Sequence, residues 1–528
     1  MIVSIFNDVI GPVMRGPSSS HCAAALRIGR LARDLMEGAL DTVLVEFDRA
    51  GSLPTTHESQ GSDMGLFGGL LGWETPDERL PDSARHLAAA GVKLEFATID
   101  AGDPHPNTYR LTLARREERH TLHAISTGGG MIEVIAIDDF PVSIGGDYFE
   151  TLLWPTGDPA ALRDRLLAGF AADAVIVHAH DGRHLVEVKG PAFVPETTMA
   201  ALREAGLVGR VRHLAPVLPV LSRRTTAVPF TTCAGMLEHD AGRGRPLWEW
   251  AVAYEAARGG LSPDEVQARM VELVRLLRRS IAQGLAGTQH DDRVLGFQSG
   301  RFAERMAAGG LLDGGALNRI VLYVTALMEV KSALGVIIAM PTAGACAALP
   351  GAVIGLADER GLGDEEVARA LLAAGLIGVF IATAWTFAAE VGGCQAEGGA
   401  AASMAAAALV TLAGGSLAQS VTAASMALQN MLGLICDPVA NRVEVPCLGK
   451  NVMAASNALA CANMALADFA AVIPLDEVIA AARQVAGQMP RELRCTALGG
   501  LSVTPTSLAL EQELARRKGC GGAGGCGG

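Results

Sequence analysis

Aromatic residues are scarce in this chain of 528 residues: Phe, Trp and Tyr make up 4% of it, whereas hydrophobic residues make up 50%. The buried core must therefore consist mainly of Ala, Leu, Val and Ile side chains. The chain has no run of Lys or Arg and its net charge is −13, which argues against a nucleic-acid partner. A chain of this length is expected to form two or three domains.

A secretory signal is also missing from the first residues, MIVSIFNDVI, which have no positively charged start and include Asp8. The ten cysteines show no repeated pairing pattern, so we expect a reducing cytoplasm and metal ligation rather than disulfide bonds. Residues 370–389 carry no charge and could span a membrane. Their Ala-rich composition and the lack of a flanking Lys or Arg cluster instead predict a buried helix of a soluble protein, without membrane contact.

The sequence patterns divide the chain and predict an α+β multidomain fold. Residues 1–148 alternate strand-like segments such as 42–47 with helix-like segments such as 23–36, which predicts an α/β domain. Residues 149–225 are again mixed and predict a small βαβ-like segment or linker. Residues 226–517 are Ala-rich and almost wholly helical, which predicts an all-α catalytic domain. Residues 518–528 are rich in Gly and Cys and predict a flexible tail.

Three cysteines in the most apolar third of the chain each stand within two residues of a Gly or a Pro and near an acidic residue. They are Cys394 in GGCQAE, Cys436 in LICDPV and Cys447 in VEVPC, 42 and 11 residues apart. Three thiols without an obvious fourth indicate a [4Fe–4S] cluster with one iron open to act as a Lewis acid. Zinc is the alternative metal, but no His follows His290. Buried cysteines that bind nothing are the remaining alternative.

Polar motifs in the first half offer candidate ligands for a small anion. The segment GPSSSH places Ser18, Ser19, Ser20 and His21 before a helix, where hydroxyl groups and free N–H groups suit a carboxylate, unless they form only a helix cap. A triple glycine at 128–130 suits the close approach of a ligand. Other motifs of the chain add candidates, which are Ser62 and Asp63 in QGSD, His105 and Asn107 in DPHPNT, Thr342 and Gly344 in MPTAG, and Lys450 and Asn451 after the third cysteine.

Together these stretches resemble the iron–sulfur L-serine dehydratases, also called L-serine ammonia-lyases. GPSSSH resembles the beta chain of that family, and GGCQAE, NMLGLICDPV, VEVPC and the closing GGL…TPT resemble its alpha chain. The likeness covers nearly the whole chain, so it implies both subunits fused in one polypeptide. It implies a [4Fe–4S] cluster on Cys394, Cys436 and Cys447, and the conversion of the amino acid L-serine to pyruvate and ammonia. Family members often carry a regulatory ACT-type module in the middle, which residues 149–225 resemble only faintly.

The resemblance also assigns expected roles. Catalytic roles are expected for His21, His105 and Lys450, with His57 as a further candidate base. Substrate binding is expected from Ser18, Ser19, Ser20, Ser62, Asp63, Asn107, Thr342, Gly344 and Asn451. The charge-free helices favour a homo-oligomer, most simply a dimer. The tail thiols of Cys520 and Cys526 are hypothesised to cap the open iron when substrate is absent.

Several residues depart from the family pattern near the expected site. Gln60 stands where the family has His, Ala345 where it has Ser, and Cys495 where it has Glu, and residues 383–391 differ throughout. A site that recognises a substrate hydroxyl group discriminates less between substrates when its hydrogen-bonding residues change. The identity of the substrate is therefore left open. L-Serine is the first expectation, and threonine, a 3-hydroxy dicarboxylate or cysteine are alternatives. A non-catalytic iron–sulfur sensor is a further alternative.

Overall fold

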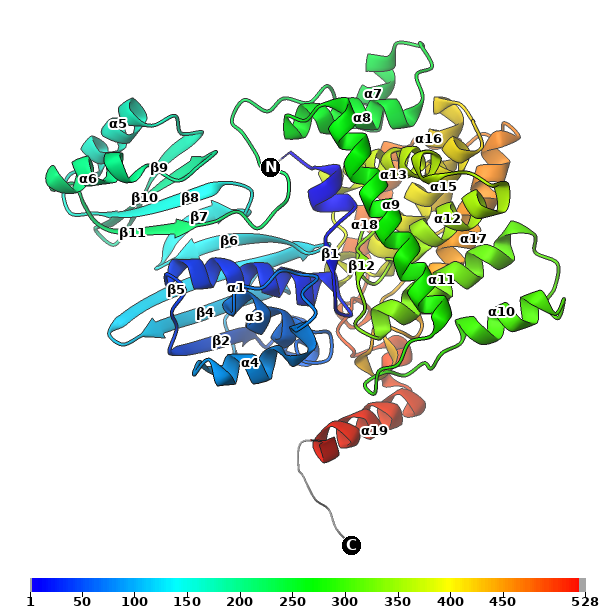
Figure 1. Cartoon of the computed structure of the whole chain (residues 1–528), viewed down its shortest axis with the longest axis horizontal. Helices are drawn as coiled ribbons and strands as arrows, with labels where there is room; N and C mark the ends of the chain where they lie inside the picture. The colour runs from blue at the N-terminus through cyan, green and yellow to red at the C-terminus, as the bar shows by residue number, and fades with distance from the viewer. Residues whose placement is uncertain (1, 522–528) are drawn as a thin grey trace, which may run out of the picture.

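The computed structural model describes residues 2–521, with the side chains of residues 2–517 (Figure 1). Two sheets lie on one side of the molecule and a helical bundle on the other. This arrangement confirms the α+β multidomain fold expected from the sequence.

The first sheet has six strands in the order β3-β2-β4-β5-β6-β7, and only β2 and β3 run parallel. Apolar side chains of its covering helix α1, among them Ile28 and Leu31, pack on Val43 and Val45 of the sheet. The strands are β2 (Thr42–Asp48), β3 (Lys93–Ile99), β4 (Thr108–Arg115), β5 (Glu118–Gly128), β6 (Met131–Ile137) and β7 (Phe140–Ile144). The helices are α1 (Ala24–Leu35), α2 (Leu53–Thr56), α3 (Ser62–Leu70) and α4 (Ser83–Ala89).

The middle segment forms a second, antiparallel sheet in the order β11-β8-β10-β9 with two helices, a βαββαβ arrangement. Its elements are β8 (Phe149–Pro155), α5 (Pro159–Gly169), β9 (Ala174–His180), β10 (Arg183–Gly190), α6 (Glu196–Glu204) and β11 (Val208–Leu214). Leu162, Leu166, Val186 and Met199 are part of its own apolar core. The segment is therefore a folded unit and not a linker.

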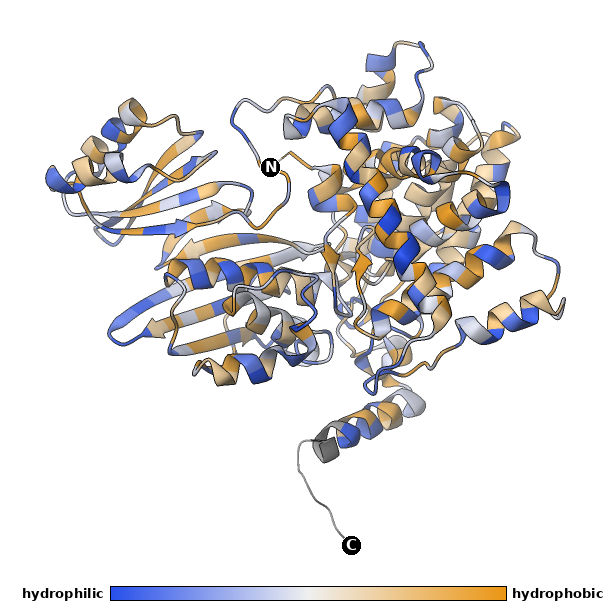
Figure 2. Cartoon of the chain, in the orientation of Figure 1, coloured by the Kyte–Doolittle hydropathy of each residue, from blue (hydrophilic) through white to orange (hydrophobic). Residues whose placement is uncertain are grey.

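The remaining helices make up the helical half, in which α19 extends away from the bundle (Figure 1). They are α7 (Cys233–Asp240), α8 (Leu247–Gly259), α9 (Pro263–Ala286), α10 (Ser299–Ala307), α11 (Ala316–Ser332), α12 (Ala348–Arg360), α13 (Asp364–Ala384), α14 (Ala389–Gly392), α15 (Ala400–Leu412), α16 (Leu417–Gln429), α17 (Cys447–Leu466), α18 (Leu475–Gln488) and α19 (Pro505–Gly521). Figure 2 shows hydrophilic and hydrophobic bands alternating along α9, as expected of an amphipathic surface helix. Ser262 and Glu265 form a capping box at its start.

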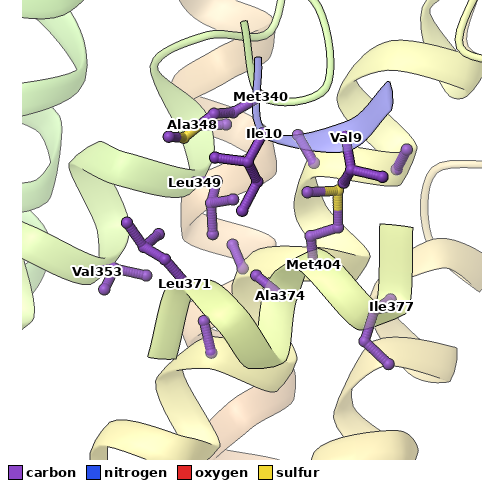
Figure 3. Packing of buried hydrophobic residues seen from close by; sticks show 14 of the residues in the cluster. Val9, Ile10, Met340, Ala348, Leu349, Val353, Leu371, Ala374, Ile377 and Met404 are labelled. Carbon is purple, nitrogen blue, oxygen red and sulfur yellow. The ribbon is translucent and has the colours of Figure 1, made fainter. Parts of the chain in front are cut away.

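The N-terminal residues cross from the sheets into the bundle. The turn Ile5–Val9 packs on α13, and β1 (Val13–Met14) pairs with β12 (Ile337–Ile338) of the otherwise helical half. Figure 3 shows Val9 and Ile10 among buried side chains of α12, α13 and α15. The close packing of Val9 on α13 needs a glycine, because a Cβ on Gly378 would lie 2.1 Å from Val9 Cγ1.

Helix α13 covers most of the charge-free stretch 370–389. By length and composition it could cross a membrane, but most of its apolar window is buried within the chain. It packs against α8, α9 and α15. At the other end of the bundle, α19 continues to Gly521, into the segment predicted as a tail. The side chain of Cys520 and the whole of residues 522–528, with Cys526, lie outside the described part, as does their expected capping role.

Candidate active site and metal centre

The three predicted thiols belong to separate segments, and all are buried. Cys394 and Cys436 pack together, and Cys447 lies near enough to Cys394 for the two to interact electrostatically. Cys394 follows Gly393, whose φ of +67° suits glycine and lets the chain turn at the end of α14. Cys447 begins α17 directly after Pro446. The Sγ atoms of Cys394 and Cys436 and a carboxylate oxygen of Glu397 all lie within 4.8 Å of one another.

Cys394 is the thiol that links the other two electrostatically. The pKa of Cys436 is raised well above its ordinary value, first by a side-chain hydrogen bond with Cys394 and then by one with Cys495. Burial raises the pKa of Cys447, and the charge of Cys394 adds to that shift. Since Cys394 opposes the ionisation of both Cys436 and Cys447, a cation at this place would favour the thiolate forms.

Lys450 brings positive charge to the thiols. Its Nζ donates to Asp437 Oδ1 and to the carbonyl of Ile435, both at 2.7 Å, and lies 3.8 Å from Cys394 Sγ. Burial opposes the charge of Lys450, but the neighbouring Cys394 and Asp437 keep its pKa above the ordinary value. The fully buried Lys331 adds a second cation, which interacts with Cys447. The donor set of clustered thiols with two cations fits an anionic iron–sulfur cluster, and the thiols alone also suit zinc.

Glu397 follows Cys394 in the sequence, in the turn Gln395–Gly399, whereas α14 precedes Cys394. Burial raises its pKa to about 7, and the Thr342 hydroxyl opposes that shift. Its carboxylate lies against Gly344, where an added Cβ would be 3.0 Å from Oε1. The predicted residues Thr342 and Gly344 therefore contact Glu397, a residue to which the sequence analysis gave no role.

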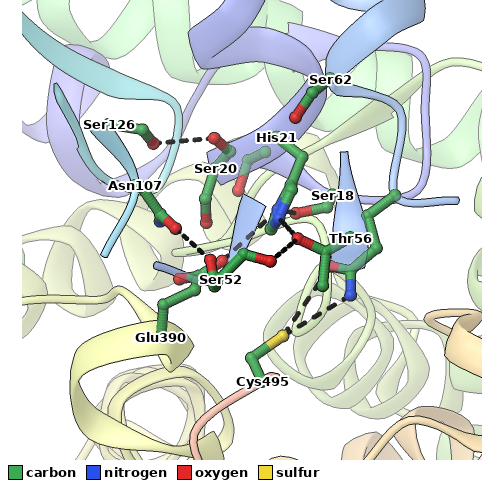
Figure 4. A network of polar contacts seen from close by, with 12 residues as sticks. Ser18, Ser20, His21, Ser52, Thr56, Ser62, Asn107, Ser126, Glu390 and Cys495 are labelled. Atoms are coloured by element: carbon green, nitrogen blue, oxygen red, sulfur yellow. Dashed lines mark hydrogen bonds and ion pairs between the residues drawn. The ribbon is translucent and has the colours of Figure 1, made fainter. Parts of the chain in front are cut away.

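His21 is buried at the centre of a polar network built by both halves of the chain (Figure 4). Its Nδ1 lies 3.0 Å from Ser18 Oγ and 3.4 Å from Glu390 Oε1, and its Nε2 lies 2.8 Å from Thr56 Oγ1. The Thr56 hydroxyl already donates to the carbonyl of Ser52, so it must accept its hydrogen bond from Nε2–H of His21. The Nδ1 lone pair of His21 then faces Ser18 and Glu390. Burial lowers the pKa of His21 to about 3, so the ring is neutral at neutral pH.

Glu390 joins His21 to the metal centre, because it stands on α14 just before Cys394. Burial raises the pKa of Glu390, and the nearby side chains of Asn107 and Ser20 oppose the shift. Asn107 Oδ1 accepts from Ser52 Oγ, so Nδ2 is the Asn107 atom that faces Glu390. Oε2 of Glu390 and Nδ2 of Asn107 are both buried, and neither makes a well-aligned hydrogen bond among the described residues. A polar ligand between them would satisfy both the acceptor and the donor.

Some predicted substrate ligands have other partners. The Ser19 hydroxyl accepts from the Ala343 amide at 3.1 Å, and the Ser20 carbonyl accepts from Ser126 Oγ at 2.8 Å. Asn451 uses its whole amide within the protein: Oδ1 accepts from the amides of Ala347 and Ala348, and Nδ2 donates to the carbonyls of Gly344 and Cys447. Asn451 therefore ties the Cys447 helix to the loop that carries Thr342 and Gly344.

Three further predicted residues make their contacts within the first sheet domain. Ser62 Oγ lies 2.8 Å from the Tyr109 hydroxyl, and Asp63 Oδ1 lies 2.7 Å from His57 Nδ1. His105 accepts the Asn107 amide and the Thr108 hydroxyl within its own turn. The structure therefore brings His21 and Lys450 to the site, whereas His105 serves the turn that positions Asn107.

The triple glycine approaches protein backbone rather than an open ligand site. A Cβ on Gly128 would lie 2.6 Å from the Ala388 amide nitrogen, and φ is +109°. Gly129 similarly lies against the carbonyl of Pro341. The expected close approach is thus real, but it joins β5 to the segment that leads into Glu390.

Two departures from the family pattern meet beside the thiols. Cys495 Sγ lies 3.7 Å from Gln60 Nε2 and 3.8 Å from Gln60 Oε1. Gln60 Nε2 also donates to Asn441 Oδ1 at 3.1 Å. Cys495 packs with Cys394 and Cys436 in one buried cluster. Sequence spacing marked only three thiols, and the contact with Cys495 depends on the tertiary fold.

Comparison with known proteins gives consistent matches along the chain. The family described as "Serine dehydratase alpha chain" matches residues 242–502. The probable L-serine dehydratase alpha chain of Bacillus subtilis is 38% identical over 251 residues, which cover 48% of this chain and 84% of that protein. The beta chain of the same organism is 41% identical over 145 residues, 28% of this chain and 64% of that protein. The L-serine dehydratase of Streptomyces coelicolor is 28% identical over 518 residues, covering 95% and 99% of the two chains.

Proposed function

Because this chain belongs to the L-serine dehydratase family, with beta-chain and alpha-chain parts in one polypeptide, we propose that it is a lyase that converts L-serine to pyruvate and ammonia on a [4Fe–4S] cluster. The observation that carries the proposal is the His21–Glu390 pair: Glu390 stands on α14, where Ala389, directly before it, packs with the thiols of Cys394 and Cys436. An acid–base pair next to a metal centre is the combination that a β-elimination needs.

Cys394, Cys436 and Cys447 would hold the cluster, with Lys450 and Lys331 balancing its negative charge. When bound there, the cluster supplies a Lewis-acidic iron that makes the β-hydroxyl of the substrate a better leaving group. The thiols alone also suit zinc, but the family membership favours the cluster.

We propose that the buried side chains of Asn107 and Glu390 bind the amino acid. Asn107 Nδ2 donates a hydrogen bond to the substrate carboxylate, and its orientation is set by the hydrogen bond from Ser52. Oε2 of Glu390 faces the α-carbon and takes its proton. Both atoms are buried and already oriented, so binding requires little reorganisation.

His21 positions Glu390. Its Nδ1 lone pair faces Oε1 and accepts a hydrogen bond from a protonated Glu390, while the ring stays neutral because burial lowers the pKa of His21 and raises that of Glu390. The ionised form of Glu390 is then the base, and it holds the α-proton at Oε2. Loss of the α-proton and the hydroxyl group as water leaves aminoacrylate, which tautomerises and takes up one water to give pyruvate and ammonia.

A cavity of about 260 Å³ lies between the first sheet domain and the helical half. It is lined by Lys331, Arg442 and Glu444 of the helical half and by Gly61 and Met64 of the first domain. Because the charge of Lys331 also acts on Cys447, we propose this cavity as the route of the substrate toward the thiols. A substrate that is small and zwitterionic suits such a charged passage.

The first test is anaerobic purification, followed by iron, sulfide and zinc analysis, visible absorption, EPR, and a pyruvate assay with L-serine in the same sample. We expect iron and sulfide in equal amounts and pyruvate formation that depends on the protein. Zinc in place of iron would overturn the cofactor, and a cluster without pyruvate would overturn the substrate.

A lyase of the same family acting on another β-substituted acid is a second candidate, because Gln60 and Cys495 together replace a histidine and a glutamate of the family pattern. A panel of threonine, 3-hydroxy dicarboxylates and cysteine tests it. This candidate is favoured if one of these compounds reacts faster than L-serine. The rate measured is ammonia release for the amino acids and dehydration for a dicarboxylate. Turnover of any of these compounds excludes a purely sensory protein.

A further inference from the structure

Cys495 places a fourth thiol at the proposed cluster. Resting on that cluster, we propose that Cys495 is its fourth protein ligand while substrate is absent. The three thiols expected from the sequence would leave one iron without a protein ligand. Cys495 is 5% exposed, as are Cys394 and Cys436, and the three pack in one cluster with Ala389.

The backbone holds Cys495 directly beside a ligand. The Cys495 amide donates to the carbonyl of Cys436 at 3.2 Å, and the Cys436 amide donates to the carbonyl of Leu493 at 2.9 Å. These bonds form an isolated parallel bridge between Cys436 and Arg494. The separation of the two thiols is therefore set by a short piece of sheet and not by a flexible loop.

The segment around Cys495 adopts an unusual conformation that the rest of the fold stabilises. Cys495 has a φ of +56° and Ala497 a φ of +58°, a region that residues with a side chain rarely adopt. Such a conformation persists where surrounding contacts impose it. Arg491 Nε donates to the carbonyl of Ala50 at 2.9 Å, and Thr55 Oγ1 donates to the carbonyl of Thr496 at 3.1 Å. The first sheet domain thus holds the Cys495 segment against the metal centre.

The neighbours of Cys495 argue against a nucleophilic role. Its polar partner is Gln60, an uncharged amide 3.7 Å from Sγ, whereas a nucleophilic cysteine is usually paired with an imidazole that takes its proton. Cys461 shows how an ordinary buried thiol is placed here, since it contacts Asn430 at the end of α16 and Asn457 one turn earlier on α17. Cys495 instead faces two thiols, which favours metal ligation.

Ligation by Cys495 follows simple chemistry. The S–H bond breaks, the proton leaves to solvent, and an iron–thiolate bond forms without a change of oxidation state. A cluster with four thiolate ligands keeps all its irons more firmly than one with three. Substrate must displace this thiolate, so the residue also raises the substrate concentration needed for turnover.

Cluster oxidation tests the proposal without an activity assay. The test starts from a parent variant with the substitutions Cys520→Ser and Cys526→Ser, so that the tail thiols play no part. Cys495→Ala and Cys495→Glu are introduced into this parent. The cluster of all three proteins is reconstituted anaerobically and titrated with ferricyanide, and EPR follows the formation of a three-iron cluster. We expect both variants to lose one iron about tenfold faster than the parent. Cys461→Ser in the same background is the matched control and should behave as the parent does.

Equal rates of iron loss in the parent and both variants would overturn the inference. Pyruvate formation from L-serine by that parent would show that the proposed function stands regardless. If the parent binds no iron at all, the inference and the cofactor of the proposed function both fail. Cys495→Glu restores the family residue, and its melting temperature shows whether any loss of iron reflects misfolding.

Discussion

Nδ1 of His21 lies 3.4 Å from Oε1 of Glu390, and both side chains are excluded from solvent. His21 belongs to the turn before α1 in the sheet-bearing half, and Glu390 belongs to α14 beside the first thiol. Neither half therefore contains the complete acid–base pair. Activity should depend on the contact between the two halves as much as on either residue.

Removing either member of the pair should abolish most turnover while leaving the cluster in place. We expect Glu390→Gln and His21→Ala each to lower kcat by about 10²–10⁴-fold, because a positioned acid–base group contributes that much. His180→Ala is the matched control, since His180 lies on β9 of the second sheet, away from this pair, and it should lose far less. Steady-state kinetics with iron analysis provide the measurement. Full activity in Glu390→Gln would disprove its role as base.

Replacing a thiol of the metal centre should lower the iron content of the purified protein, whereas replacing another buried thiol should not. Cys394→Ser and Cys447→Ser are expected to purify with less than half the iron of the unaltered protein, because each removes a ligand. Cys461→Ser, which changes a buried thiol of α17 outside the cluster, should keep its iron. Iron and sulfide assays on anaerobic samples decide the matter. Iron retention in Cys447→Ser would show that Cys447 is not a ligand.

Gly128 should be needed for the junction that positions Glu390. In Gly128→Ala the new Cβ would meet the Ala388 amide at 2.6 Å, with φ at +109°, so the two segments must separate. We expect a loss of about 1–3 kcal/mol in stability together with a lower kcat. Gly182→Ala is the control, because φ there is +73° but nothing lies within 4 Å. If both variants melt alike, backbone strain rather than contact explains the effect.

Acid should destabilise the fold through His21. Burial lowers the pKa of His21 to about 3 in the folded chain, whereas the unfolded chain binds the proton near the ordinary value of 6.5. The unfolded state therefore binds more protons as the pH falls from 6.5 toward 3, and stability falls with it. The loss from this group is about 2 kcal/mol between pH 7 and pH 5. Thermal unfolding of His21→Asn should show a smaller loss over this range, and parallel curves would contradict the expectation.

The sequence by itself determined the fold class, the three thiols and the relation to the dehydratases. These features depend on short-range information: apolar residues at helical or strand spacing, a glycine or proline within two residues of each cysteine, and contiguous motifs such as GPSSSH and GGCQAE. His21 and Lys450 were predicted for the same reason, since each stands inside or directly after such a motif. The helix 370–384 was also readable as core, because its composition is rich in Ala and Gly rather than in larger apolar residues.

Only the tertiary structure decided which polar groups meet. Glu390 lies in a stretch that differs from the family motifs, and its role depends on contact with His21 from the other half of the chain. His105 and Asn451 looked like site residues in sequence, yet their hydrogen bonds are taken up by neighbouring backbone. Cys495 joins the thiols because a short bridge places Arg494 beside Cys436. Local patterns record the conformation of neighbouring residues, whereas a site assembled from distant segments depends on packing that no local pattern records.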